Sequence, residues 1–265
     1  MLELRLVQAT LFKNVVEALG DLFSTAHFNS SRTGLELQAK DNSRVTLIML
    51  LLRAEAFDHY LCDRGLSMGL NLAGMAKAFC CTNNDDIITI KAEEDWSDTV
   101  TFTFESPEDG DEISYFHFDF MVINGVPLEI PEYPESEYQA IVRMPSAKFM
   151  PICNKLSSFG DRDTVVIISV DKESVDFLSR GKTGTLTIFC RETQTVDKPK
   201  EPTLIEMKEK VSLMFDLRYM NSSKASTLSD QVTISLSSKL PAVFEYKITE
   251  MSCIRYYMLP RNEGR

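Results

Sequence analysis

The chain has 265 residues, of which 44% are hydrophobic and 25% are charged, which is typical of a soluble globular protein and excludes disordered, collagen-like and coiled-coil classes. Lys and Arg total 28 against 39 Asp and Glu, giving a formal net charge of −11. This excess of acid excludes a protein that coats nucleic acid with its whole surface, so any contact with DNA has to be local.

The first residues predict a short strand, Leu2–Val7, rather than a secretory signal, because Glu3 and Arg5 interrupt the apolar positions. The longest apolar run, Val45–Leu52, predicts a buried strand, since a membrane-spanning helix needs about 20 apolar residues. Six cysteines without a C-x-x-C pair and only three histidines indicate neither a disulfide framework nor a zinc site. We therefore expect reduced, buried thiols and an intracellular protein without metal.

An internal repeat organises the rest of the chain. In the first half, a helix with apolar residues on one face is followed by a strand at Leu35–Leu37 and a second helix over Leu72–Phe79. In the second half, the matching segments are a helix around Phe149, a strand at Val175–Phe177 and a second helix over Leu217–Lys224.

The matching segments lie at steady offsets, 149 − 12 = 137, 175 − 35 = 140 and 244 − 102 = 142 residues. Both halves end in a predicted hairpin, formed by Ile87–Lys91 with Thr99–Glu105 and by Gln231–Leu236 with Val243–Ile248. The pattern predicts an α+β fold of two similar domains, each with two helices on one face of antiparallel sheet. An acidic stretch rich in Pro and Gly predicts an extended linker between the domains.

Catalytic motifs are weak in this sequence. Gly181-Lys182-Thr183 imitates the end of a phosphate-binding loop, but Asp176 stands where that motif requires glycine. Asp85-Asp86 and Glu93-Glu94-Asp95 have the chemistry of metal ligands, although acidic pairs beside turns are usually solvated. The histidines lie in separate segments without a nucleophile motif. The sequence therefore predicts a protein that is not an enzyme, with a metal-dependent enzyme built on the acidic pairs as a hypothesis of a different class.

Each predicted helix carries at least one base on its outward face. The bases are Lys13 on the first helix, Lys77 on the second, Lys148 and Lys155 on the third, and Arg218 and Lys224 on the fourth. On a single helix such bases indicate only a solvated face. Because equivalent helices of a repeat point the same way, these bases are expected to gather on one surface of an otherwise acidic protein.

A series of ungapped segments between Met1 and Pro260 points to a family: LRLVQATLFKNVVEAL, YLCDRGLSMGLNLAGMAK, NNDDIITIKAEE, SDTVTFTFESP, SEYQAIVRMPSAKF, ICNKLSSFGD, IEMKEKVSLMFDLRYMN and LPAVFEYKITEMSCIRYYMLP. They closely resemble the proliferating cell nuclear antigen family, the eukaryotic DNA sliding clamps, with a plant-like character. The resemblance implies a duplicated two-domain DNA-clamp fold. It also implies a homotrimeric ring whose helices line a central hole and whose antiparallel sheets lie outside.

Within this fold the resemblance implies an N-terminal clamp domain over residues 1–119, an interdomain connector over 120–137 and a C-terminal clamp domain over 138–265. The ring would encircle double-stranded DNA without sequence preference, because lysine and arginine attract phosphates without reading bases. The implied DNA-binding residues are Lys13, Arg64, Lys77, Lys148, Lys155, Arg218 and Lys224.

The resemblance also implies sites for proteins. Partner peptides of the form Gln-x-x-aliphatic-x-x-aromatic-aromatic would place one apolar helical turn in a groove. That groove would consist of Val45, Leu47, Leu128, Ile130, Pro241, Tyr257 and Pro260. Subunits would join through the edge strands Ile113–Phe118 and Thr185–Cys190, using Ile113, Phe116, Phe118, Leu186 and Ile188. Lys172 aligns with the family's acceptor for ubiquitin and SUMO.

Several positions depart from the family pattern. Asn14, Gly20, Cys80, Pro151 and Asn154 stand where the family usually has Lys or Arg on the ring lining. In the groove, Lys40 replaces a methionine, while Asp216 and Leu259 replace small residues beside the pocket for the peptide glutamine. A weaker hold on DNA and a smaller contribution of that glutamine are therefore expected.

The function implied by the resemblance is a nuclear processivity factor without cofactor or membrane contact. It would serve DNA replication, repair and translesion synthesis by docking DNA polymerase, flap endonuclease, ligase and the clamp loader through peptide motifs. The alternative is a divergent paralogue or checkpoint-type clamp subunit in a heteromeric ring.

Overall fold

The chain forms two compact units in a computed structural model that describes residues 1–7, 9–20, 22–40, 46–92, 98–107, 112–122, 133–160, 165–181, 184–193, 202–220 and 227–261. The first unit contains Met1–Asn42, Ile48–Ile130 and Ile248–Ile254. The second contains Ser43–Leu47, Pro131–Lys247 and Arg255–Arg265. Each unit therefore takes segments from distant parts of the sequence.

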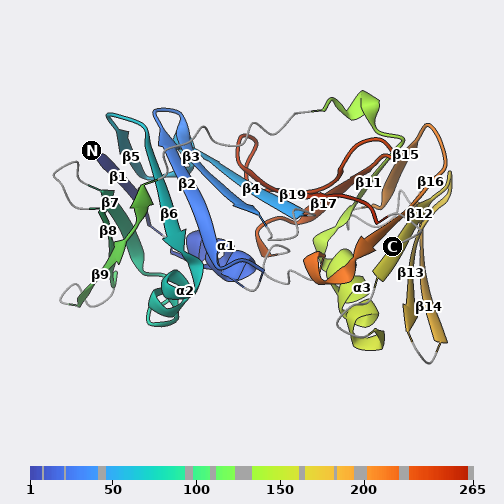
Figure 1. Cartoon of the computed structure of the whole chain (residues 1–265), viewed down its shortest axis with the longest axis horizontal. Coiled ribbons are helices and arrows are strands. Elements are labelled where there is room, and N and C mark those ends of the chain that lie inside the picture. The colour runs from blue at the N-terminus through green and yellow to red at the C-terminus, as the bar shows by residue number, and fades with distance from the viewer. Residues whose placement is uncertain are drawn as a thin grey trace. The chain divides into compact units, whose positions relative to one another are not determined.

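Among its described residues, the first half of the chain forms ten strands and two α-helices (Figure 1). The strands are β1 (Leu2–Leu6), β2 (Thr25–Ser31), β3 (Gly34–Lys40), β4 (Thr46–Arg53), β5 (His59–Cys62), β6 (Leu66–Asn71), β7 (Ile87–Ala92), β8 (Thr99–Glu105), β9 (Ile113–Asp119) and β10 (Met121–Val122). The helices are α1 (Thr10–Gly20) and α2 (Leu72–Cys80), with a 3-10 turn, η1 (Ala54–Ala56). One sheet has the order β5-β1-β7-β8-β9, and neighbouring strands run β10-β6-β2-β3-β4 in another.

The second half repeats this plan, and the part that the structure describes contains one α-helix, α3 (Ser146–Phe159), and two 3-10 turns, η2 (Glu135–Glu137) and η3 (Leu217–Tyr219). Its strands are β11 (Ala140–Pro145), β12 (Val165–Val170), β13 (Ser174–Gly181), β14 (Gly184–Arg191), β15 (Leu204–Met207), β16 (Val211–Asp216), β17 (Gln231–Leu236), β18 (Ala242–Lys247) and β19 (Cys253–Met258). They are arranged in the orders β14-β13-β12-β16 and β19-β18-β17-β11-β15. The two predicted hairpins are confirmed, because β7 pairs with β8 and β17 with β18, both antiparallel.

Each core is built around a phenylalanine from the first helix of its unit. Phe12 of α1 lies 6.1 Å from Phe79 and 6.4 Å from Phe28 between ring centroids. Phe149 of α3 lies 5.9 Å from Phe177 and 6.1 Å from Phe244. Phe12 and Phe149 are the residues that the 137-residue offset matched, so the repeat read from the sequence corresponds to equivalent packing.

The predicted fourth helix, Leu217–Lys224, differs from the structure over its described part. Residues Leu217–Tyr219 form a single 3-10 turn, η3, and Lys224 lies outside the described residues. Burial of Leu217 and Tyr219 on either side of exposed Arg218 fits a tight turn, which turns about 120° per residue, as well as it fits a helix. Among the described helices, none is long and apolar enough to cross a membrane.

Candidate functional site

In the first unit the predicted DNA-binding bases differ in their exposure and in whether they already hold a hydrogen-bond partner. α1 and α2 pack against each other (Figure 1). Lys13 of α1 is half-buried, and its Nζ donates a hydrogen bond to the Thr82 carbonyl at 3.2 Å. Lys77 is exposed in the last turn of α2. Arg64 is also exposed, in the connection between β5 and β6 rather than on a helix.

The second unit shows the same division. Lys148, in the first turn of α3, is half-buried and donates from Nζ to Thr203 Oγ1 at 2.9 Å. Lys155 is exposed further along α3. Arg218 is exposed in η3, where its guanidinium stacks 4.4 Å from the centroid of the Tyr219 ring. Arg64, Lys77, Lys155 and Arg218 are the exposed members of the predicted set in the described chain, although Arg218 also donates a hydrogen bond to the Tyr219 hydroxyl. Lys13 and Lys148 are half-buried and hold partners.

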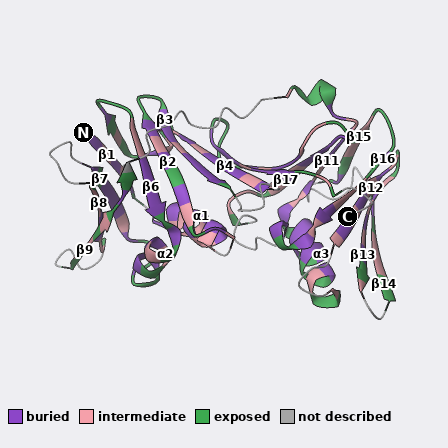
Figure 2. Cartoon of the chain, viewed as in Figure 1, coloured by how far each residue is buried: buried purple, intermediate pink, exposed green. Residues whose placement is uncertain are grey.

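The two strands predicted for subunit contact lie at sheet edges. β9 is the outermost strand beside β8, and β14 is outermost beside β13. On β9, residues alternate between exposed and half-buried (Figure 2). Phe116 and Phe118 face inward and meet Phe104 and Phe102 edge to face, at centroid distances of 5.6 and 5.2 Å. Ile113 is exposed, and Leu186 and Ile188 of β14 are half-exposed.

Two large side chains on these edges were missed by the sequence prediction. Tyr115 on β9 is 60% exposed and Phe189 on β14 is 67% exposed. Tyr115 shares the exposed face of β9 with Ile113 and alternates with Phe116 and Phe118, while Phe189 alternates with Ile188, so each edge strand presents apolar side chains on both of its faces. The family resemblance indicated these strands, and only their place at the sheet edge distinguishes the two rings from core residues.

The described residues of the predicted peptide groove all belong to the second unit. Leu47, Pro241 and Pro260 are half-exposed, and Tyr257 of β19 is buried. Val45, Leu128 and Ile130, together with most of the predicted connector, lie outside the described residues. A further residue, Tyr138, was not predicted.

Tyr138 lies directly after η2 and is 94% buried, in an environment shared with Tyr257 and Tyr133. Burial, together with the neighbouring phenols of Tyr257 and Tyr133, raises the pKa of Tyr138 to about 12. Tyr138 is therefore a neutral aromatic neighbour of the predicted groove residue Tyr257. The sequence analysis did not predict Tyr138 because it lies in a short segment of proline and acidic residues.

Asp216, which stands where the family usually has a small residue, has an ion-pair partner that the sequence analysis did not predict. Asp216 Oδ1 lies 2.7 Å from Arg261 Nη2, and the carboxylate side chain is only 10% exposed. The backbone of Arg261 also donates to the Met214 carbonyl at 2.8 Å. The Asp216 carboxylate, which was expected to place an unpaired charge beside the glutamine pocket, is thus paired with Arg261. Leu259, the other replacement beside that pocket, is apolar and 49% exposed.

Lys172 is exposed in the turn between β12 and β13. Asp171 shapes this turn by accepting hydrogen bonds from the backbone N–H groups of Glu173 and Ser174, each at 3.0 Å. Those two N–H groups lower the pKa of the Asp171 carboxyl below its usual value. The lysine is thus accessible on an ordered turn.

Other candidate groups have structural roles or differ from expectation. Asp86 is buried and accepts a hydrogen bond from the Asn83 amide at 2.8 Å, which closes a turn, and Glu93–Asp95 lie outside the described residues. All six cysteines are free, as predicted, but Cys80 and Cys81 are exposed rather than buried. They occupy the last turn and the C-cap of α2, where the helix leaves its packing against the sheet.

Two family models match the chain. The model described as proliferating cell nuclear antigen, N-terminal domain, matches residues 1–126. The model described as proliferating cell nuclear antigen, C-terminal domain, matches residues 132–261. The two matches follow each other along the chain and together include every described element of the fold.

Proposed function

Because this chain belongs to the proliferating cell nuclear antigen family, we propose that it is a DNA sliding clamp that acts as a processivity factor and docking platform. The observation that carries the proposal is the match of both clamp domains, in order, to a chain that folds as two similar α+β units. Clamp domains of this family point to a non-catalytic scaffold. We place its work in replication and repair in the nucleus of a eukaryotic cell.

The ring itself is part of the proposal. Three copies would join head to tail, with the β9 edge of one copy completing the β14 edge of the next, because unpaired edge strands favour pairing with another chain. The exposed bases Arg64, Lys77, Lys155 and Arg218, with Lys13, Lys148 and Lys224 as further contributors, would attract DNA phosphates. Such contacts carry no sequence information, which suits a protein that slides.

The docking role rests on the groove around Tyr257. Partner peptides would insert an apolar helical turn against Tyr257, Leu47 and the unpredicted Tyr138, together with Leu128 and Ile130. DNA polymerase, flap endonuclease, ligase and the clamp loader are the proposed partners. Lys172, exposed on its turn, is the proposed acceptor for ubiquitin-like modification during translesion synthesis.

The proposed clamp is tested by its mass in solution and by its retention on circular DNA. Sedimentation of the full chain should give three times 30.0 kDa, whereas a subunit of a mixed ring would stay monomeric. After loading onto nicked circular DNA by a eukaryotic clamp loader with ATP, the protein should co-elute with the circle. Cutting the circle once should release it, because a closed ring slides off an end. Release without cutting, or retention after it, would contradict encirclement.

The groove is tested separately with a fluorescent Gln-x-x-Leu-x-x-Phe-Phe peptide and measured by anisotropy. Tyr257→Phe keeps the ring that contacts the peptide, whereas Tyr257→Ala removes apolar contact worth about 1–3 kcal/mol at an interface hot spot. Binding should therefore survive the first change and weaken with the second. Replacing the peptide glutamine with alanine should have little effect, since exposed Leu259 and the Asp216–Arg261 pair lie at the predicted pocket.

A further inference from the structure

The turn η2 has few apolar contacts of its own to hold it in place. Glu135, Ser136 and Glu137 are all exposed, and the turn is closed by backbone bonds from Glu137 to Pro134 at 2.9 Å and from Tyr138 to Glu135 at 3.2 Å. A single 3-10 turn is a weak structure in isolation. Its position on the second unit therefore depends on contacts with the rest of the unit, among them the backbone bonds of Gln139 to Leu236 and Lys208 and the side chains described next.

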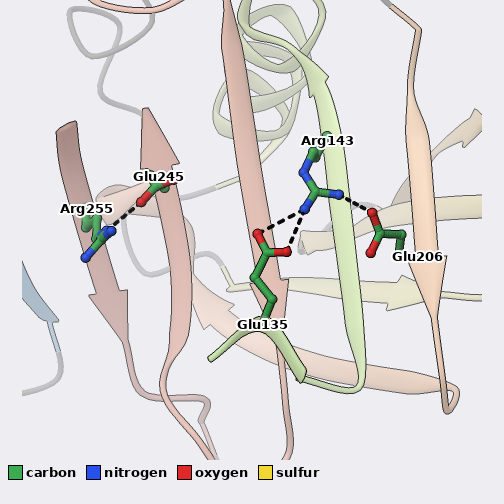
Figure 3. A network of polar contacts seen from close by, with 5 residues as sticks. All are labelled: Glu135, Arg143, Glu206, Glu245 and Arg255. Atoms are coloured by element: carbon green, nitrogen blue, oxygen red, sulfur yellow. Dashed lines mark hydrogen bonds and ion pairs between the residues drawn. The ribbon is translucent and has the colours of Figure 1, made fainter. Parts of the chain in front are cut away.

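Arg143 of β11 supplies the main contact (Figure 3). Its Nη2 donates to both carboxylate oxygens of Glu135 at 3.0 Å, and its Nη1 donates to Glu206 of β15. The arginine side chain is only 22% exposed, while the Glu135 and Glu206 side chains are 64% and 65% exposed. Burial by itself would lower the pKa of Arg143, but the hydrogen bonds to Glu206 and Glu135 raise it overall, so the guanidinium stays charged.

A second set of contacts fixes the residues around Glu135. Lys208 donates from Nζ to the Ser136 carbonyl at 2.6 Å. The side chain of Gln139 accepts from the Ser238 amide at 2.7 Å and donates to Glu209 at 2.9 Å. These bonds hold the chain on either side of Tyr138, and Arg143 is the contact that fixes the side chain at the start of the turn.

The 3-10 turn η2 also sets the position of Tyr138. Its backbone N–H closes η2 by bonding to the Glu135 carbonyl, and its side chain is buried within electrostatic range of the Tyr257 phenol. A shift of Glu135 would therefore move the backbone that carries Tyr138. The Glu206 side chain pairs with Arg143 from β15, on the far side of β11 from the sheet strands that lead to β19. Its connection to η2 runs only along the chain to Lys208 and Glu209, which do not depend on its carboxylate for their own bonds to Ser136 and Gln139.

We propose that Arg143 is a positioning residue for peptide binding, which clamps Glu135 so that η2 holds Tyr138 beside Tyr257 in the groove. The inference rests on the proposed function of that groove. The predicted occupant remains a peptide with an apolar helical turn. Arg143 itself does not contact the peptide, and it acts through Glu135 and the turn.

The test measures peptide affinity by fluorescence anisotropy for the full chain and its variants, with the Gln-x-x-Leu-x-x-Phe-Phe peptide as probe. Arg143→Met and Glu135→Gln should each weaken binding roughly 2- to 5-fold, as expected for losing a charge-assisted contact to an exposed carboxylate. Glu206→Gln is the matched control. It removes the other partner of the same arginine, at the same exposure, and should leave the affinity unchanged.

Two further readouts separate positioning from general stability. Hydrogen exchange of the Glu137 and Tyr138 amides should accelerate in Arg143→Met and Glu135→Gln but not in Glu206→Gln. In the Glu206→Gln background, the exchange of charges by Arg143→Glu with Glu135→Arg should restore both affinity and protection. Glu135→Gln changes an exposed side chain, so it tests the clamp even if Arg143→Met folds poorly.

The outcomes are distinct. If the unmodified chain binds no peptide, the proposed groove is wrong. If it binds the peptide and Glu135→Gln binds equally well, the groove stands and the positioning role of Arg143 is overturned. Equal losses in Glu135→Gln and Glu206→Gln would also overturn it, because they would show a general effect of charge.

Discussion

Gly34 has a backbone conformation and surrounding atoms that leave no room for a side chain. Its φ of +147° lies in the region that side chains disfavour, and a Cβ there would approach the Leu52 carbonyl oxygen to 2.2 Å. Gly34→Ala should destabilise the fold by about 1–3 kcal/mol or more, measured by urea denaturation. Gly20→Ala is the control, because a Cβ at Gly20 meets nothing within 4 Å. Equal stability of the two variants would contradict this account.

Asp171 makes part of the stability dependent on pH. Its pKa is lowered in the folded state by the amides of Glu173 and Ser174, so the unfolded chain binds a proton more readily. The stabilisation is therefore present above the ordinary aspartate pKa of about 3.9 and is lost as pH falls through the lower folded value.

Asp171→Asn should remove this contribution while keeping an oxygen that can accept both bonds. In urea denaturation the variant should be less stable than the parent at neutral pH, and the two should converge as the pH falls below about 4. A difference in stability that stays constant with pH would show that the carboxylate charge of Asp171 does not matter.

Among the elements, the edge strand β9 carries two kinds of aromatic residue that the sequence analysis did not distinguish, one packed within its own unit and one exposed. Phe116 packs against Phe104 within its own unit, whereas Tyr115 is 60% exposed. If β9 is a subunit edge, both Tyr115→Ala and Phe116→Ala should produce monomers in sedimentation. Only Phe116→Ala should also destabilise the monomer, by about 2 kcal/mol, because it removes a partly buried ring. A Tyr115→Ala protein that stays trimeric would exclude this edge from the interface.

For the molecule as a whole, the lining charge sets how the proposed ring holds DNA. Each neutralised phosphate contributes about −0.9 to the slope of log affinity against log salt. Gly20→Lys and Asn154→Arg add bases at a helix end with open space and at an exposed position of α3. The double variant should bind short linear duplex more tightly at low salt, with a steeper salt slope and an unchanged mass.

The matched control, Gly20→Glu with Asn154→Glu, should weaken binding and flatten the slope. If both pairs of substitutions leave the affinity for linear duplex at the parent value, these positions do not approach DNA. Retention on a closed circle after loading should be affected far less than affinity, since topology rather than contact prevents escape.

Much of the fold was predictable because its signals are local. The spacing of Phe12, Val15 and Leu19 predicts a helix with one buried face, and that face is buried in α1. Alternation predicted β7, β8, β17 and β18 nearly to the residue. The fourth predicted helix was less secure, because buried Leu217 and Tyr219 around Arg218 fit a 3-10 turn as well as a helix.

The sequence by itself determined the family, the repeat and the chemical character of each site, since these depend on residue order and local periodicity. Only the tertiary structure decided which charges are free: Lys13 and Lys148 hold partners on segments 69 and 55 residues away, and Asp216 is paired with Arg261. It also brought Tyr138 within electrostatic range of Tyr257 and placed Arg143 between Glu135 and Glu206. Such contacts join distant positions whose side chains meet only after strands pair and pack, so no local pattern encodes them.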